Sequence, residues 1–227
     1  MHSKLLILLF AIAVSVYPTG EPLAQESHQD DSMGRRIEEK YGTILYRTRW
    51  KVKIIKVCWE SLSTSTQDQR ALVEAAATNS WQHYSGIRFD FQRNQRCQPN
   101  QPGVHIQVGS VRPRTEKLGK LLDGRENGMK LNFNPDTFAR IECKGRESVC
   151  ITAMAVHEFG HALGFTHEQN RPDAPPECRD EHASGSVGDY LVTKYDPKSI
   201  MNYCEPLWEG NGELSPLDQE AVRAVYP

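Results

Sequence analysis

A short stretch of the chain, residues 157–167, has the residue types and spacing of a metal site. His157 and His161 are four residues apart, so in a helix both imidazoles project from one face, one turn apart. That spacing lets two ring nitrogens reach one Zn²⁺ ion. Glu158 is offset around the helix, so it is poorly placed as a third ligand but can reach a water beside the ion. The residues predict a zinc site with an acid–base group next to it.

A third histidine, His167, can join the site only if the chain changes direction after His161. A continued helix would carry His167 round and away from the metal. Gly164 lies between the two histidines, and glycine can adopt the left-handed conformation that brings the chain back. Three neutral nitrogen ligands leave a position open for water, as in catalytic rather than structural zinc sites. We therefore predict His157, His161 and His167 as ligands of one catalytic Zn²⁺.

Glu158 is the predicted catalytic residue of this site. A water held by Zn²⁺ has a pKa lowered from about 15.7 toward about 7. Glu158 would take a proton as that water attacks a carbonyl, and would return it to the leaving amine. The alternative is a chance cluster of two histidines and a glutamate on a helix. Gly164 and His167 at fixed offsets argue against chance.

Four segments are predicted to be strands, since they begin with or keep an alternation of polar and apolar residues. They are residues 51–59, 87–91, 104–108 and 128–134. A helix between the first two strands implies a crossover connection, and hence a mixed sheet with parallel members.

Capping signals place the helices. Thr66 and Gln69 form a capping box, and the helix that follows should end near Gly86. Its apolar face consists of Val73, Ala77, Trp81 and Tyr84. A second helix should begin around residues 148–151 and carry the histidines. The last helix begins after Ser215, with Pro216 in its first position and Asp218 completing a second capping box.

The beginning of the chain resembles a targeting segment. Residues 1–24 are predicted to be a signal peptide, because the apolar run from Leu5 to Val16 is short for a membrane span. The cleavage site stays open, and an uncleaved anchor is the alternative. Residues 25–49 lack a periodic apolar face and are interpreted as a leader or short propeptide. Residues 50–227 would form one catalytic domain.

Composition supports a single domain and gives no reason to expect a charged partner. The chain has 227 residues, 38% of them hydrophobic, and a net charge of -2. We expect one core, no nucleic-acid partner, no membrane span in the mature chain, and a monomer. A local run of basic residues is interpreted as a solvated loop. It comprises Arg112, Arg114, Lys117, Lys120 and Arg125.

The cysteine count points to an oxidising compartment. Six cysteines behind a signal peptide favour three disulfides and a secreted protein. The sequence alone leaves their connectivity open. We favour the short loop Cys143–Cys150 and the pair Cys178–Cys204, which leaves Cys58–Cys97.

A methionine-containing segment, Ser199 to Tyr203, follows the histidines. Behind a three-histidine zinc motif, such a turn is what the metzincins carry beneath the metal. The continuation Glu168–Asp173 and the pattern Leu214–Asp218 fit as well. On these residues the chain resembles the metzincin zinc metallopeptidases, and within them it is most similar to the astacin family.

The resemblance implies an α+β zincin-like fold. It would have a twisted mixed β-sheet with two long helices above an active-site cleft, and an irregular C-terminal subdomain that ends in a helix. Tyr203 would be a second catalytic residue, as an extra zinc ligand or a hydrogen-bond donor to the transition state. Residues 128–134 would be the edge strand that pairs with an extended peptide substrate. Glu168 would pair with an amino terminus freed by activation.

The function that the resemblance implies is that of a secreted zinc-dependent endopeptidase acting on proteins or peptides. Two alternatives remain. A catalytically silent relative that binds a partner would have no need of Glu158. A zinc hydrolase of another kind, such as an amidase on a non-peptide substrate, fits the spacing of Gly164 and His167 less well.

Overall fold

The computed structural model describes residues 35–36, 44–134, 143–182, 185, 187–205 and 209–227. The chain divides into two units, Met1–Asp30 and Asp31–Pro227, and all described residues belong to the second. The predicted signal peptide and most of the predicted leader lie outside the described residues. In the part that is described, no helix combines the length and apolar character needed to cross a bilayer.

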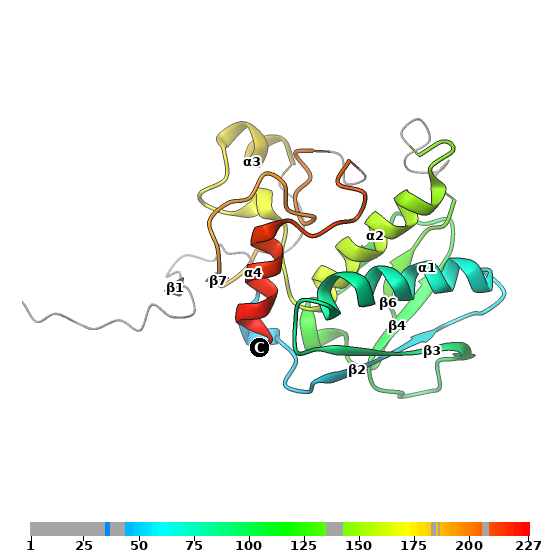
Figure 1. The fold of residues 1–227 in the computed structure, drawn as a ribbon. Helices are drawn as coiled ribbons and strands as arrows, with labels where there is room; N and C mark the ends of the chain where they lie inside the picture. Colours follow the sequence, from blue (N-terminus) through cyan, green and yellow to red (C-terminus); the bar gives the residue numbers. More distant parts are fainter. Residues whose placement is uncertain (1–34, 37–43, 135–142, 183–184, 186, 206–208) are drawn as a thin grey trace, which may run out of the picture. The chain divides into compact units, whose positions relative to one another are not determined.

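A five-stranded mixed sheet forms the base of the fold, with the order β3-β2-β4-β6-β5. Figure 1 labels its four longer strands. The parallel strands are β2 (Ile54–Trp59), β3 (Arg88–Arg96), β4 (Val104–Val108) and β6 (Arg125–Leu131). One face of the sheet is buried, as the alternation predicts: in β2, Ile55 and Val57 are buried while Ile54 and Lys56 are exposed. The predicted strands are all present, with ends shifted by a few residues.

The edge of the sheet differs from the expectation. Residues 128–134 were expected to be the edge strand, but the corresponding strand β6 lies inside the sheet. The short strand β5 (Arg114–Thr115) covers it, pairing antiparallel with Lys130 and Met129. Two residues are too few to produce a periodic pattern, and β5 sits within the basic run that we interpreted as a solvated loop. The interpretation of the basic run as a solvated loop was therefore wrong, because part of that run forms the edge of the sheet.

Two helices pack on the buried face of the sheet (Figure 1). Helix α1 (Gln67–Ala77) begins with the predicted capping box, since Gln69 N donates to Thr66 Oγ1 over 3.2 Å and Thr66 N to Gln69 Oε1 over 2.9 Å. A π-helical segment, η3 (Thr78–Gln82), continues it. Helix α2 (Glu147–Ala162) runs through the centre of the molecule, and nearly all of its residues after Cys150 are buried.

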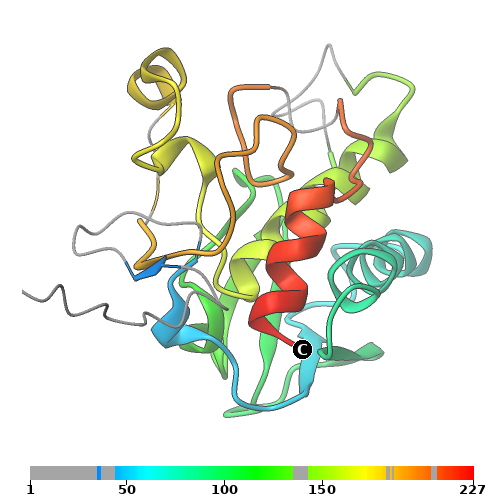
Figure 2. The ribbon, with the colours of Figure 1, turned by 60° about the vertical axis from the view of Figure 1, so that its left-hand side comes forward.

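The chain after α2 is mostly irregular. It contains the 3₁₀ turn η6 (Glu168–Asn170), the short helix α3 (Pro176–His182) and the strand β7 (Tyr190–Leu191), which pairs with β1 (Arg35–Arg36). Further 3₁₀ turns are η2 (Tyr46–Thr48) and η4 (Gly119–Leu122). The last element, helix α4 (Pro216–Val225), lies beside the C-terminal end of α2 (Figure 2), where Tyr226 Oη donates to Leu163 O over 2.6 Å. This arrangement confirms the predicted α+β class.

Three disulfides brace these elements, and they are the pairs that we favoured. Cys58–Cys97 joins the strands β2 and β3 at one end. Cys143–Cys150 holds the first turn of α2. Cys178–Cys204 connects α3 to the segment that follows Met201. The last two disulfides therefore fix the chain on either side of the histidines.

Candidate active site

Helix α2 presents the first two histidines side by side. His157 and His161 lie on one face of the helix, with ring centroids 4.7 Å apart. Both are buried, so their rings are held by packing rather than moving freely in solvent. The predicted projection from one face of a helix is observed.

Gly164 turns the chain immediately after α2. Its φ of +101° lies in the region that residues with a side chain rarely adopt. Gly164 N donates to His161 O over 2.9 Å, and Phe165 N to Gly160 O over 3.0 Å. These two bonds form a Schellman motif, which ends a helix through a left-handed residue. The helix end predicted from Gly164 is thus present, and it directs the following residues back toward α2.

The turn brings His167 to the other two histidines. Its Nε2 atom lies 3.2 Å from His157 Nε2 and 3.0 Å from His161 Nε2. Backbone carbonyls accept from the opposite ring nitrogens of the α2 histidines, since His157 Nδ1 is 2.7 Å from Ile200 O and His161 Nδ1 is 2.8 Å from Phe165 O. A carbonyl cannot donate, so Nδ1 carries the proton and Nε2 is left with a lone pair. The Nε2 atoms of the three histidines therefore converge, and at least two of them direct a lone pair at the space between the rings.

The electrostatics of this cluster suit a cation. Burial, together with the neighbouring His167, lowers the pKa of His157 to about 3 and holds the pKa of His161 well below its usual range. Both imidazoles are therefore neutral at physiological pH, which is the form that binds zinc. Neutral nitrogen donors with backbone-fixed tautomers fit Zn²⁺. The other group of potential ligands among the described residues, around His105, contains Cys58 and Cys97, which are joined in a disulfide.

The methionine-containing turn lies directly below the histidines. Met201 is buried and packs against Gly160 of α2, where any side chain would collide with the Met201 sulfur. Asp218, at the start of α4, accepts from Ile200 N over 2.9 Å and from Ser199 Oγ over 2.6 Å. Since Ile200 O is the acceptor for His157, the cap of the last helix also supports a histidine ring.

Glu158 is buried beside the cluster and lines the same cleft. Its Oε2 atom accepts a 2.6 Å hydrogen bond from Thr115 Oγ1 of β5. Burial raises the pKa of Glu158 to about 8, while the Thr115 hydrogen bond and the charge of Arg114 act in the opposite direction. A carboxyl group with a raised pKa can both accept and release a proton near neutral pH.

The ring of Tyr203 packs against the rings of two of the histidines. Its ring centroid is 4.8 Å from that of His157 and 4.7 Å from that of His167. Burial, with a smaller contribution from Glu158, raises the pKa of the Tyr203 phenol. The hydroxyl therefore keeps its proton and can act as a hydrogen-bond donor in the cleft.

The cleft has a volume of about 530 Å³ and brings together Glu158, His161, His167 and Tyr203. Its opposite wall is formed by residues 112–118, which include β5. All five predicted site residues therefore gather in one place, with His157 buried behind the cleft-lining histidines.

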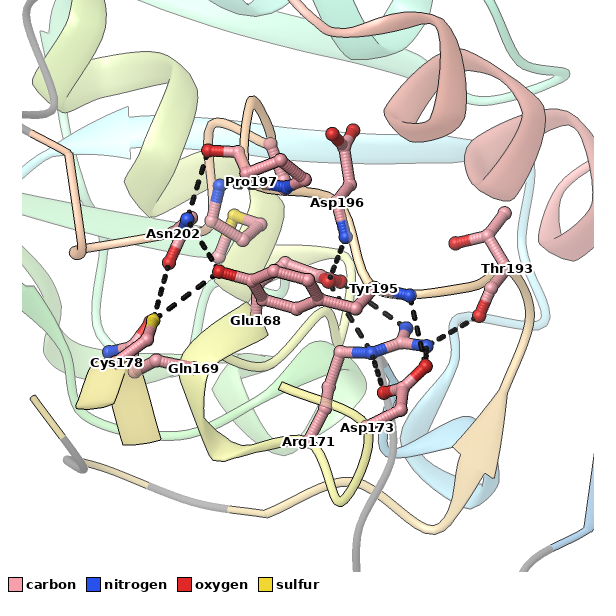
Figure 3. Close-up of polar contacts among 12 residues, drawn as sticks. Glu168, Gln169, Arg171, Asp173, Cys178, Thr193, Tyr195, Asp196, Pro197 and Asn202 are labelled. Carbon is pink, nitrogen blue, oxygen red and sulfur yellow. Dashed lines mark hydrogen bonds and ion pairs between the residues drawn. The ribbon is translucent and has the colours of Figure 1, made fainter. Parts of the chain in front are cut away.

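An ionic cluster centred on the buried Arg171 lies beyond the last histidine (Figure 3). Arg171 is fully buried and forms a two-pronged pair with Asp173, with Nε–Oδ1 and Nη2–Oδ2 distances of 2.8 Å. Its Nε is also 3.4 Å from Glu168 Oε2, an atom that accepts from Asp196 N over 3.1 Å. Burial raises the pKa of Glu168 to about 7, and Arg171 opposes that rise. The pairing of Glu168 with an amino terminus stays a prediction.

Residues 145–184 match the peptidase family described as Astacin. The chain is similar to the astacin family. The matched segment contains α2, all three histidines and the buried Arg171. The resemblance inferred from the sequence is thus confirmed, and the histidine cluster is of the kind that holds the catalytic zinc of astacins.

Two sea-urchin proteins extend the astacin-like similarity beyond this segment. Blastula protease 10 of Paracentrotus lividus is 25% identical, over 89% of this chain and 36% of that protein. Protein SpAN of Strongylocentrotus purpuratus is 26% identical, over 83% of this chain and 29% of that protein. The chain therefore spans about a third of the length of these relatives.

A solved structure shares the fold. The structure of myroilysin matches with a TM-score of 0.59 and 20% identity, over 81% of this chain and 98% of that chain. At this identity the match concerns the fold, and it agrees with the mixed sheet, the central helix and the C-terminal helix.

Some contacts at the site have no signal in the sequence. Thr115 lies in a strand too short to be recognised, and nothing marks it as a neighbour of Glu158. Asp218 was identified only as a helix cap, which is a local role. The brace from Asp218 to Ile200 depends on how α4 packs, and that is a tertiary feature.

Proposed function

We propose that the chain is a secreted zinc-dependent endopeptidase that hydrolyses peptide bonds in proteins. The observation that carries the proposal is the convergence of three histidines beside a buried glutamate in one open cleft. His157, His161 and His167 would hold the ion. When bound there, Zn²⁺ supplies Lewis acidity toward a carbonyl group and makes a water acidic enough to ionise near neutral pH.

The protein's own groups account for the proton transfers and for orientation. Glu158 accepts a proton from the attacking water and delivers it to the departing amine. Tyr203 donates its hydroxyl hydrogen toward the carbonyl oxygen on which negative charge develops. Strand β5 forms the wall of the cleft and the edge of the sheet, so its outer backbone groups can pair with an extended peptide.

Secretion is supported by two independent features. Three disulfides are present among the described residues, and disulfides persist in oxidising compartments. The apolar run from Leu5 to Val16 has the length of a signal-peptide core.

Metal dependence provides the test of this function. The purified full chain should cut an unstructured protein into fragments, lose that activity with a chelator, and regain it when zinc is added. His161→Ala should abolish zinc binding, measured as metal content per chain, because it removes one of three ligands. His83→Ala is the matched control, since His83 is exposed on the segment after α1, and it should keep the metal.

Each alternative gives a different result in the same assay. If the wild-type chain held zinc but produced no fragments, it would be a binding module and the proposal would be wrong. If it hydrolysed small amides but left every protein substrate intact, it would be a zinc amidase instead.

The role of Tyr203 leads to a separate expectation. Tyr203→Phe should lower kcat by about 10²-fold, the usual cost of losing one donor to a developing oxyanion, while zinc content stays unchanged. Steady-state kinetics on a peptide substrate measures the change. Tyr84→Phe is the control, because Tyr84 is not among the residues that line the cleft, and it should have the wild-type rate. An unaltered rate in Tyr203→Phe would remove the tyrosine from the mechanism.

A further inference from the structure

The short edge strand β5 is held firmly in place next to α2. Thr115 pairs with Met129, and Glu116 N donates to Gly128 O over 2.8 Å. The carboxylate of Glu116 also lies 2.7 Å from Lys130 Nζ of β6 and 2.9 Å from Arg114 Nε. The backbone ladder and this pair of contacts fix the position of Thr115 relative to the sheet.

The Thr115 hydroxyl of this strand hydrogen-bonds Glu158 of α2. Thr115 Oγ1 is 2.6 Å from Glu158 Oε2 and 3.3 Å from Glu158 O. A hydroxyl has a single hydrogen, and the shorter contact with the carboxylate is the stronger one. Among the described residues, no other group hydrogen-bonds the Glu158 carboxylate. Because Glu158 lines the cleft, its Oε1 is the oxygen that remains available there.

We propose that Thr115 is a positioning residue for the reaction, holding Oε2 of Glu158 so that Oε1 stays directed at the attacking water. This inference rests on the proposed peptidase function. A glutamate side chain rotates about three bonds, and in a cleft open to solvent a carboxylate with no partner can swing away from a productive orientation. One short hydrogen bond from a rigid strand removes that freedom before the substrate arrives.

The geometry also links substrate binding to the base. Thr115 belongs to the strand that would pair with an extended peptide, so the backbone that orients the substrate also carries the group that orients Glu158. A displacement of β5 would change both together. This coupling is a property of the edge strand and not of the zinc ligands.

The test compares two substitutions at one position. Thr115→Val keeps the shape and removes the hydroxyl, and we expect kcat to fall about 10- to 100-fold with KM altered by roughly twofold at most. Thr115→Ser keeps the hydroxyl and should restore most of the rate. Zinc content should match the wild type in both variants, because the three histidine ligands are unchanged.

A double-mutant cycle with Glu158 shows whether Thr115 acts through the base. If it does, Thr115→Val should cause no further loss in a Glu158→Ala background. Losses that multiply would overturn the inference, as would a wild-type kcat in Thr115→Val or equal losses in the valine and serine variants.

The two proposals fail in different ways. A wild-type chain that binds zinc but cleaves nothing would overturn the peptidase function and this inference with it. An active wild type with an unaffected Thr115→Val would overturn only the role of Thr115.

Discussion

Replacing Glu158 with alanine or glutamine is expected to reduce kcat for peptide hydrolysis by about 10²–10⁴-fold while one zinc ion remains bound per chain. Alanine removes the proton acceptor completely. Glutamine keeps the size and can still accept from Thr115 through its amide oxygen, but it cannot take up a proton from water. Equal losses in the two variants would therefore assign the effect to proton transfer rather than to shape.

The glutamine substitution should also stabilise the protein once zinc has been removed. In the folded chain burial raises the pKa of Glu158 from 4.5 to about 8. The folded state therefore favours the protonated form, and the stability associated with this group is fully present below pH 4.5 and is lost as the pH rises through 8. At pH 8, Glu158→Gln should consequently have a higher thermal midpoint than the wild type, with the difference disappearing toward pH 4.5.

An exposed glutamate on α4 supplies the control. Glu220→Gln should change neither the rate nor the thermal midpoint. Hydrolysis by Glu158→Gln at the wild-type rate would show that another group is the base. A lower thermal midpoint for Glu158→Gln than for the wild type at pH 8 would contradict the assignment of Glu158 as a carboxylate whose burial costs stability.

The parts of the site that the sequence predicted are those specified by local rules. The four-residue spacing of His157 and His161 works because a helix repeats about every 3.6 residues. Gly164 ends that helix because a left-handed residue closes the Schellman motif, and His167 follows within three positions. Each of these features depends on residues that are close in the sequence, so the amino-acid sequence alone suffices to infer them.

The parts that the sequence missed depend on contacts between distant segments. Strand β5 contributes two residues to the sheet and exists because β6 offers it an edge, which no local pattern reveals. Thr115 and Glu158 are 43 positions apart. Asp218 supports Ile200 only because α4 packs beneath the turn. The basic composition near β5 also favoured a loop, since charge runs are usually solvated.

The chain beyond His167 shows a similar limit. The irregular structure that the resemblance implied is present, but irregular backbone must find many of its hydrogen bonds in side chains. Arg171 serves this purpose: its Nη2 atom donates to Thr193 O over 2.6 Å, in addition to its carboxylate partners. Asp173 in turn accepts from Tyr195 N over 3.0 Å. A buried charge thus takes the place of a secondary-structure ladder.

Arg171→Leu should consequently lower the free energy of unfolding by about 3–5 kcal/mol, the usual cost of removing one partner from a buried ion pair. The leucine would leave Glu168 without its cationic neighbour and Thr193 O without a donor. Arg171→Lys keeps the charge but cannot form the two-pronged contact with Asp173, so its loss should be smaller. Denaturant unfolding with the disulfides intact measures both, and Arg88→Leu on the exposed face of β3 is the control.

Acidic pH should partly rescue Arg171→Leu, since the substitution removes a positively charged neighbour of the buried Glu168 carboxyl. Burial already raises the pKa of this carboxyl from 4.5 to about 7, and the loss of Arg171 removes a group that opposes the rise. Because the folded pKa exceeds the unfolded one, the stability linked to Glu168 is fully present below pH 4.5 and decreases as the pH rises. The deficit of Arg171→Leu relative to the wild type should therefore be smaller at about pH 5 than at about pH 8. A deficit that is independent of pH, or no larger than that of Arg88→Leu, would show that the cluster beyond His167 does not depend on this charge.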